Sequence, residues 1–338
     1  MAKTYRVGVA GMVHDHIWGL AKTFAGCPNA TLVAAADPNE PLRTKMQEQH
    51  GVSALYADYG EMLDKEDLDV IVITTENSGA APIVEAAAAK GIHMVVEKPM
   101  AATLGQADRM LNAAEAAGVQ LMVNWATAWR PNIVKALELA GSGAIGQVYN
   151  VRVRMAHHGP KELGCSEYFY GWLYDAEKNG AGAFMDYCCY GAAFCRLLLG
   201  VPNAVMGAAD RLVKENFPVD DNGMVFMFYD TAYASTEASW CQIPDYHDTV
   251  ILGSKGTLVT DRGKLLIGTE PRKPMEEVDL VEPEAPKRNG PEYLLHCIET
   301  GKTVDGMCSA RVGRDAQEIL EAALISAREG RRVELPLG

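Results

Sequence analysis

Two pairs of polar side chains in this sequence have the types and spacing that proton and hydride transfer require. Glu97 and Lys98 end an apolar run and precede a proline, and Asp186 and Tyr190 lie four residues apart in an apolar stretch. Residues four apart share one face of a helix, so the carboxylate and the phenol can meet the same ligand. A base within hydrogen-bond reach assists hydride removal from a carbinol carbon, and a nearby ammonium lowers the pKa of a phenol. The alternative interpretation is a tyrosine packed in a buried helix whose first turn Asp186 caps.

The stretch VGVAGMVHDHIWGL, residues 7–20, follows the pattern of a dinucleotide-binding loop in part. Such loops carry three glycines after the first strand, because the backbone must approach a pyrophosphate and the next helix must pack closely. Gly11 occupies the first of these positions, while Val13 and His16 occupy the other two. Asp37 ends the second apolar run, where a carboxylate binds the hydroxyls of the adenine ribose and repels a 2′-phosphate. The pattern favours NAD over NADP, with a helix cap or turn residue as the alternative for Asp37.

The pair His14-x-His16 also resembles the metal-binding pair that follows the first strand of barrel amidohydrolases. That interpretation needs further histidines and an aspartate at the ends of later barrel strands. The other histidines do not fall at such regular places: His50, His93, His157, His158, His247 and His296. We therefore expect no metal, and interpret His14 and His16 as surface, helix-capping or phosphate-facing side chains.

Composition excludes several classes of function. The 338 residues carry a formal net charge of −13, which argues against nucleic acid and membrane surfaces as partners because both need clustered Lys and Arg. No apolar run reaches the roughly 20 residues of a membrane span, and the N-terminus lacks a signal-peptide layout, so we expect a soluble, cytoplasmic protein. The eight cysteines include no Cys-x-x-Cys pair and are expected to be reduced core thiols.

Strand-like and helix-like stretches alternate over the first 125 residues. Several apolar runs are rich in Val and Ile without polar alternation, as in parallel strands buried on both faces. Most of the helix-like stretches end at a glycine suited to a helix C-terminus. The alternation predicts a doubly wound parallel sheet, a Rossmann domain over residues 1–125. The strand candidates are 5–11, 31–37, 69–75, 93–99 and 119–125, and the helix candidates are 17–26, 40–51, 80–91 and 104–118.

After residue 125 the pattern changes to consecutive strands with tight turns. This predicts a C-terminal α+β domain over residues 126–338, with a large, mostly antiparallel open sheet and a helix on one face. Helices are expected at 131–141, 183–200 and 310–330. Strands are expected at 147–155 and within 224–240 and 248–268, with an exposed connection over 271–291.

Taken together, the segments VGVAG, AAAD, EKPMA, GWLYD, GAGAFMDYCCY and LLLG resemble the glucose–fructose oxidoreductase, inositol dehydrogenase and rhizopine-catabolism (Gfo/Idh/MocA) family. The resemblance extends over nearly the whole chain, including WRPNIVKALELAGSGAIGQVYNVR and the ending ISAREGRRVELPL. It implies an NAD(P)-dependent oxidoreductase that acts on a hydroxyl or carbonyl of a sugar, sugar derivative or cyclitol. It also implies that the open sheet forms a homodimer or homotetramer.

The resemblance assigns roles to individual residues. Lys98 matches the catalytic lysine and Asp186 the substrate-orienting aspartate. Tyr190 stands where most members carry His and where some branches carry Tyr; it is the expected acid/base, with its pKa lowered by Lys98 and the nicotinamide. Lys98, Asp186, Tyr190 and His157 are expected to bind substrate. The residues expected to contact the cofactor are Gly8, Gly11, Met12, Val13, His14, Asp37, Thr75, Asn77, Glu97, Lys98, Asn124 and Trp172.

The sequence departs from the family pattern at four places. Val13 and His16 replace loop glycines, Ala80 stands where a histidine is usual after Asn77, and Ala193 stands where a second aspartate is usual. These departures bear on cofactor affinity and on the type of substrate more than on the fold. The resemblance leaves two other functions open, because some relatives have them: a glycosidase that uses bound NAD without net redox, and a sensor of NAD or sugar without catalysis. The joint presence of Lys98, Asp186 and Tyr190 argues against the sensor.

Overall fold

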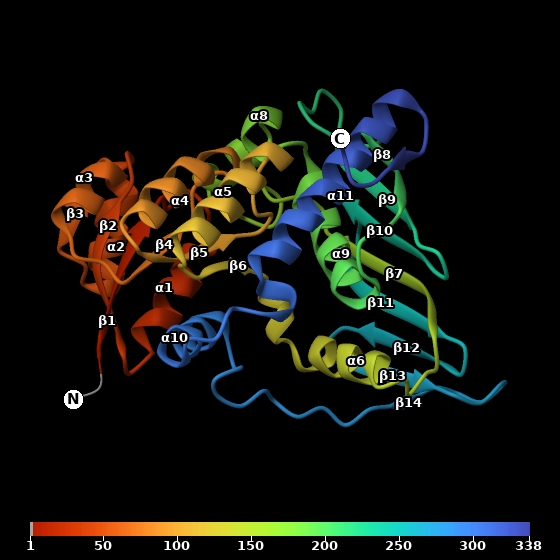
Figure 1. Ribbon diagram of the computed structural model, residues 1–338. Coiled ribbons are helices and arrows are strands. Elements are labelled where there is room, and N and C mark those ends of the chain that lie inside the picture. The colour runs from red at the N-terminus through yellow and green to blue at the C-terminus, as the bar shows by residue number, and fades with distance from the viewer. Residues whose placement is uncertain (1–2) are drawn as a thin grey trace.

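The computed structural model describes residues 3–338 and has two sheets side by side (Figure 1). The first is a six-stranded parallel sheet with strand order β3-β2-β1-β4-β5-β6. Each apolar run becomes a buried strand, and the order reverses between β1 and β4, as in a Rossmann fold. The strands are β1 (Tyr5–Ala10), β2 (Ala30–Ala36), β3 (Ala54–Tyr56), β4 (Val70–Ile73), β5 (His93–Glu97) and β6 (Leu121–Asn124).

Helices connect these strands close to the predicted bounds. Gly51 and Gly118 follow α2 and α5 in the left-handed conformation, which a glycine adopts without steric cost. The prediction lacked β3 and α3, since β3 has only three half-buried residues and no apolar run. The helices are α1 (Ile17–Ala25), α2 (Glu40–His50), α3 (Tyr59–Lys65), α4 (Ala80–Ala89) and α5 (Leu104–Ala117).

The second sheet has nine strands in the order β14-β13-β12-β11-β7-β10-β9-β8-β15. All neighbours are antiparallel except β7 and β10, which run parallel. The expected fold class, a parallel Rossmann sheet plus a mostly antiparallel open sheet, is confirmed. The strands are β7 (Val148–Ala156), β8 (Ala204–Asp210), β9 (Asn222–Phe228), β10 (Tyr233–Ser239), β11 (Tyr246–Gly253), β12 (Gly256–Asp261), β13 (Lys264–Gly268), β14 (Glu276–Glu277) and β15 (Val333–Glu334).

Helices cover one face of this sheet and leave the other bare (Figure 1). Helix α9 (Ala183–Leu199) approaches β10 closely because Gly191 has no Cβ, which would lie 2.2 Å from Thr236 Oγ1. Helix α11 (Ala310–Glu329) likewise approaches β8 at Gly207. Helix α6 (Pro131–Gly141) covers β12 and β13. The short helices α7 (Glu167–Leu173) and α8 (Ala176–Asn179) contact one another, and α8 contacts the segment 77–79 after β4.

The last part of the chain packs against both sheets. Helix α10 (Gly290–Thr300) contacts α1, and the Asn29 side chain donates to Glu299 at 2.7 Å. Helix α11 contacts α5 as well as α9 and β8. Residues from the end of the sequence therefore stabilise the first sheet. None of the helices within residues 3–338 has the length and apolar character to span a membrane.

Candidate functional site

An ion pair between Lys98 and Asp186 forms the centre of the candidate site. Lys98 directly follows β5, and its Nζ lies 2.5 Å from Asp186 Oδ1 in the first turn of α9. Both side chains are less than a tenth exposed. Burial disfavours both charges, but their mutual attraction prevails, which raises the pKa of Lys98 and lowers the pKa of Asp186. Both groups are therefore charged at neutral pH, and the ammonium acts as a positive charge rather than as a base.

The start of α9 is positioned from outside the helix. Asp220, just before β9, accepts hydrogen bonds from the amides of Gly182 at 2.6 Å and Phe184 at 2.7 Å. These amides, at the N-cap and in the first turn of α9, have no partner inside the helix. The indole Nε1 of Trp240, which follows β10, donates to Asp186 Oδ2 at 3.1 Å. The second sheet therefore fixes both the helix end and the carboxylate.

Tyr190 lies on the same helix face as Asp186, one turn further along. Lys98 Nζ is 5.0 Å from the centre of its ring, and the ring packs edge-on against Trp125. We expected Lys98 to lower the pKa of Tyr190, but burial outweighs the ammonium and raises it well above the usual value. Tyr190 is therefore a phenol at neutral pH, and the expectation of a lowered pKa is wrong for the protein without cofactor.

His157 lies beside this group, at the end of β7. Its side chain is buried, and its Nδ1 accepts a hydrogen bond from the Gly159 amide at 2.7 Å. Burial lowers the pKa of His157 to about 4, so the ring is neutral at pH 7 with its proton on Nε2. Tyr187 packs against His157 and Tyr190 and connects them. The neighbouring His158 instead pairs with Asp245 at the surface.

A hollow of about 420 Å³ lies beside the loop after β1. Gly11, Val13 and Asp37 line it, together with Thr75 at the end of β4. Gly11 has a φ of +77°, and a Cβ there would lie 2.8 Å from the Thr75 backbone, so this position needs glycine. Gly8 is not among the lining residues and lies within β1 against Leu68.

Asp37 holds the loop as well as facing the hollow. Its Oδ2 accepts from the Met12 amide at 2.5 Å, and its Oδ1 accepts from the amide and side chain of Asn39. Each carboxylate oxygen can accept more than one hydrogen bond, so capacity for ribose hydroxyls remains. Asn77 is buried and donates to Asn179 of α8 at 2.9 Å, which connects the segment after β4 to the second half of the chain.

The loop has backbone donors suited to a dinucleotide. The amides of Met12, His14 and His16 have acceptors within the protein, but those of Val13 and Asp15 have none among residues 3–338. Two unpaired amides next to the N-terminus of α1 are suited to a pyrophosphate. These donors and the hollow at Gly11 fit NAD, in spite of the two replaced glycines.

Helix α7 packs against the loop after β1. Trp172 Nε1 donates to the Val13 carbonyl at 3.4 Å, and Phe169 packs on His14 with ring centres 4.3 Å apart. Asp15 accepts from the Ser166 amide and hydroxyl, both at 2.7 Å. The segment before α7 is thus tied to the loop after β1.

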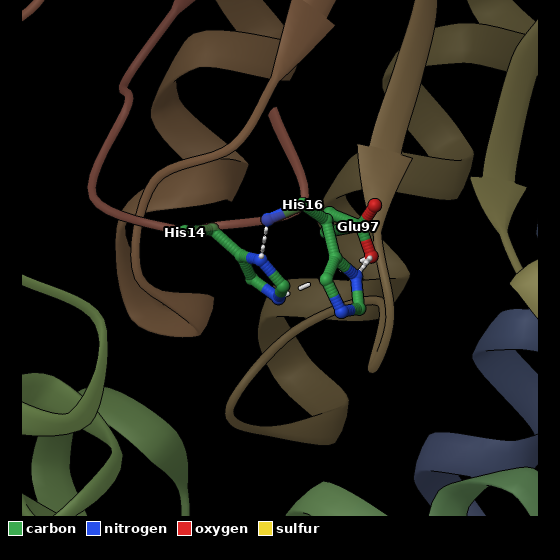
Figure 2. A group of neighbouring side chains, drawn as sticks. All are labelled: His14, His16 and Glu97. Carbon is green, nitrogen blue, oxygen red and sulfur yellow. Dashed lines mark hydrogen bonds and ion pairs between the residues drawn. The ribbon is translucent and has the colours of Figure 1, made fainter. Parts of the chain in front are cut away.

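The side chains of His14, His16 and Glu97 meet at the ends of β1 and β5 (Figure 2). His16 Nδ1 lies 3.1 Å from Glu97 Oε2, and His14 Nε2 lies 4.0 Å from the same oxygen. Asn124, at the end of β6, donates to Glu97 Oε1 at 2.6 Å. Glu97 and Asn124 were expected to contact the cofactor, and the structure places them together at the carboxyl edge of the sheet.

Sequence reasoning missed Trp240, Tyr187 and Asp220, which hold or flank Asp186. Tyr187 is adjacent to Asp186 in sequence, but its packing between His157 and Tyr190 depends on helix geometry. Trp240 and Asp220 come from the second sheet, 54 and 34 residues away along the chain. No local pattern connects such distant positions, so only the tertiary structure brings them to the site.

Two models of one protein family match the chain. Residues 6–125 match the model described as "oxidoreductase family, NAD-binding Rossmann fold". Residues 133–259 match the Gfo/Idh/MocA C-terminal domain. The two matched segments include Lys98, Asp186 and Tyr190.

Curated relatives are similar over most of their length. The chain is 28% identical to D-xylose 1-dehydrogenase (NADP⁺) 2 of Haloferax volcanii, covering 89% of this chain and 91% of that protein. It is 26% identical to D-apiose dehydrogenase of Paraburkholderia graminis, covering 95% of this chain and 86% of that protein.

Solved structures have the same fold. Aldose–aldose oxidoreductase from Caulobacter crescentus superimposes with a TM-score of 0.84 at 22% identity, covering 98% of this chain and 100% of that one. A levoglucosan dehydrogenase in complex with NADH and levoglucosan superimposes with a TM-score of 0.84 at 22% identity. The superposition covers 99% of this chain and 100% of that one.

Proposed function

Because the chain belongs to the Gfo/Idh/MocA family of oxidoreductases with an NAD-binding Rossmann fold, we propose that it transfers hydride between NAD and a sugar, sugar derivative or cyclitol. The observation that carries the proposal is the buried Lys98–Asp186 ion pair, with Tyr190 beside it. An ammonium, a carboxylate and a phenol at the carboxyl edge of a Rossmann sheet are the groups that such a reaction needs.

Lys98 is positioned to stabilise negative charge on a substrate oxygen. An ammonium has three donors, and Lys98 Nζ uses two of them on the side chain and the carbonyl of Asp186, at 2.5 and 3.2 Å. The third remains for the hydroxyl or carbonyl oxygen that becomes an alkoxide. Asp186 thereby orients the ammonium, and Trp240 orients Asp186.

Tyr190 and His157 supply protons and hydrogen bonds. As a phenol, Tyr190 can donate a proton to a carbonyl oxygen; in the oxidising direction it must first lose that proton, which the charge of Lys98 favours. The neutral His157 can donate from Nε2 to a further hydroxyl of a polyol. When bound, the nicotinamide of NAD accepts or supplies the hydride.

The substrate class rests on the relatives and on the polar lining of the site. The relatives are named for xylose and apiose, and one similar structure for levoglucosan. NAD rather than NADP is supported by Asp37, whose carboxylate lines the hollow and would repel a 2′-phosphate. One relative is nevertheless named as an NADP enzyme.

The assembly and the compartment are part of the proposal. A homodimer or homotetramer through the bare face of the second sheet is supported by exposed apolar side chains there, among them Met206, Met224 and Tyr233. A cytoplasmic location is supported by the eight cysteines, because all of them are free thiols.

The substitutions Tyr190→Phe and Lys98→Met test the proposal. Each should lower turnover by about 10²–10⁴-fold with the best aldose or cyclitol substrate, because the proton donor or the alkoxide partner is lost. Binding of NAD should persist, measured as the increase in melting temperature with NAD and, for comparison, with NADP.

The matched control is Tyr229→Phe, at a half-buried tyrosine whose hydroxyl contacts Met227 in the sheet. This variant should turn over at the rate of the unmodified enzyme. Near-normal turnover in Tyr190→Phe or Lys98→Met would remove that residue from the mechanism.

A further inference from the structure

The His14–His16–Glu97 cluster is made of side chains that ligate metals. Ligand atoms from the three residues all lie within 4.8 Å of one another. The loop after β1 supplies both histidines, and Glu97 comes from the end of β5, 81 residues further along the chain. The sequence argument against a metal required a barrel, whereas the third ligand here comes from a Rossmann strand.

The distances from Glu97 to the two histidines can be compared with those of a tetrahedral site. Bonds of about 2.0–2.2 Å to nitrogen and oxygen place neighbouring ligands about 3.3 Å apart. Glu97 Oε2 lies 3.1 Å from His16 Nδ1 and 4.0 Å from His14 Nε2. Since all three ligand atoms lie within 4.8 Å of one another, the cluster must contract by at most about 1.5 Å to hold one ion. Figure 2 shows the His16 ring nitrogen and the carboxylate oriented toward one another.

Metal binding exchanges two hydrogen bonds of the free cluster for bonds to the ion. His14 Nδ1 accepts from the His16 amide at 3.2 Å, so the ring proton is on Nε2 and must move to Nδ1 when Nε2 binds metal. His16 Nδ1 lies 3.1 Å from Glu97 Oε2, and both atoms give up this contact as they turn toward the ion.

The surroundings provide both support and access. Asn124 holds the second carboxylate oxygen of Glu97 at 2.6 Å, which is how proteins orient a metal ligand. His16 and Asn124 also line a hollow of about 560 Å³, so the cluster borders this hollow on its His16 side.

We propose that His14 Nε2, His16 Nδ1 and Glu97 Oε2 bind one divalent transition-metal ion of the zinc type, with a fourth coordination position open to water or a small ligand. Two imidazoles, one carboxylate and an open position form a ligand set that suits Zn²⁺. The site does not depend on the proposed hydride transfer, because it can be measured without cofactor or substrate.

The test is a titration of metal-stripped, tag-free protein with Zn²⁺, with calorimetry for affinity and elemental analysis after gel filtration for stoichiometry. We expect one retained equivalent. In His16→Ala and Glu97→Gln the affinity should fall by more than about 100-fold, since losing even a partner that orients a ligand costs about 10–100-fold. Asn124→Ala removes such a partner, so its affinity for Zn²⁺ should fall by about 10–100-fold. Co²⁺ in place of Zn²⁺ should give the visible absorption of a tetrahedral ion.

The control is His158→Ala, which removes an exposed histidine paired with Asp245 and should leave the affinity unchanged. Circular dichroism and melting temperature establish that each variant is folded; His16 is half-exposed, so its removal is structurally mild. The proposal is overturned if the unmodified protein retains no metal, or if folded His16→Ala binds Zn²⁺ with unchanged affinity.

Discussion

At the scale of single residues, the candidate site depends on one indole hydrogen bond. Trp240 and Trp125 are both fully buried, but Trp240 Nε1 donates to the Asp186 carboxylate, whereas Trp125 Nε1 has no partner within residues 3–338. Hydrogen bonds to charged groups contribute about 1.5–3 kcal/mol. Trp240→Phe should therefore lower the free energy of unfolding by about that amount more than Trp125→Phe does, and should also lower kcat.

Urea denaturation of the two variants measures the difference, because both lose a similar area of aromatic surface. Equal losses of unfolding free energy would mean that the bond to Asp186 contributes no net stability. Unchanged kcat in Trp240→Phe would mean that Asp186 keeps its position without the indole.

At the scale of elements, the connection between β8 and β9 is held by one carboxylate. Asp221 accepts hydrogen bonds from the amides of Leu212, Val213 and Lys214 and from the Asn222 side chain. Burial raises its pKa, but these donors prevail and lower the pKa to about 2. The folded-state pKa lies below the unfolded value of about 3.9, so the stabilisation is present above pH 4 and is lost as the pH falls toward 2. Asp221→Asn should lower the free energy of unfolding by about 2 kcal/mol at pH 7 and by little at pH 2.

The measurement is the free energy of unfolding of both proteins between pH 2 and pH 7. Asp230→Asn is the control, since that carboxylate is exposed in the turn before β10 and accepts one hydrogen bond, from the Asn203 side chain, among residues 3–338. A constant difference between Asp221→Asn and the unmodified protein across this range would contradict the assignment.

At the scale of the whole molecule, the bare face of the second sheet presents apolar rings to solvent. Phe226, Phe228 and Tyr233 form a cluster with ring centres 4.9–5.9 Å apart, and Met206 is opposite Phe226 in the neighbouring strand. Large exposed apolar patches mark interfaces. We expect the protein to sediment as a dimer or tetramer and Phe226→Glu to sediment as a monomer, because a charge would be buried unpaired in the interface.

Sedimentation velocity is the measurement, and Val281→Glu is the control because Val281 is exposed in the connection before α10. An oligomer that persists in Phe226→Glu would place the interface elsewhere. A monomeric unmodified protein would contradict the assembly as a whole.

The sequence by itself determined the two kinds of sheet and much of the candidate site. Apolar runs such as VIVI in β4 and tight turns such as the one around Asp230 are local signals in the sequence. Asp186 and Tyr190 are four residues apart, and helix geometry places residues at this spacing on one face. Strand β3 was missed because its three half-buried residues carry no periodic signal.

Only the tertiary structure decided which distant groups meet. It placed Trp240 and Asp220 beside the start of α9, brought Glu97 to His14 and His16, and made burial stronger than Lys98 in setting the pKa of Tyr190. Periodicity records the face on which a side chain lies, whereas desolvation and contacts between strands depend on everything that packs around it.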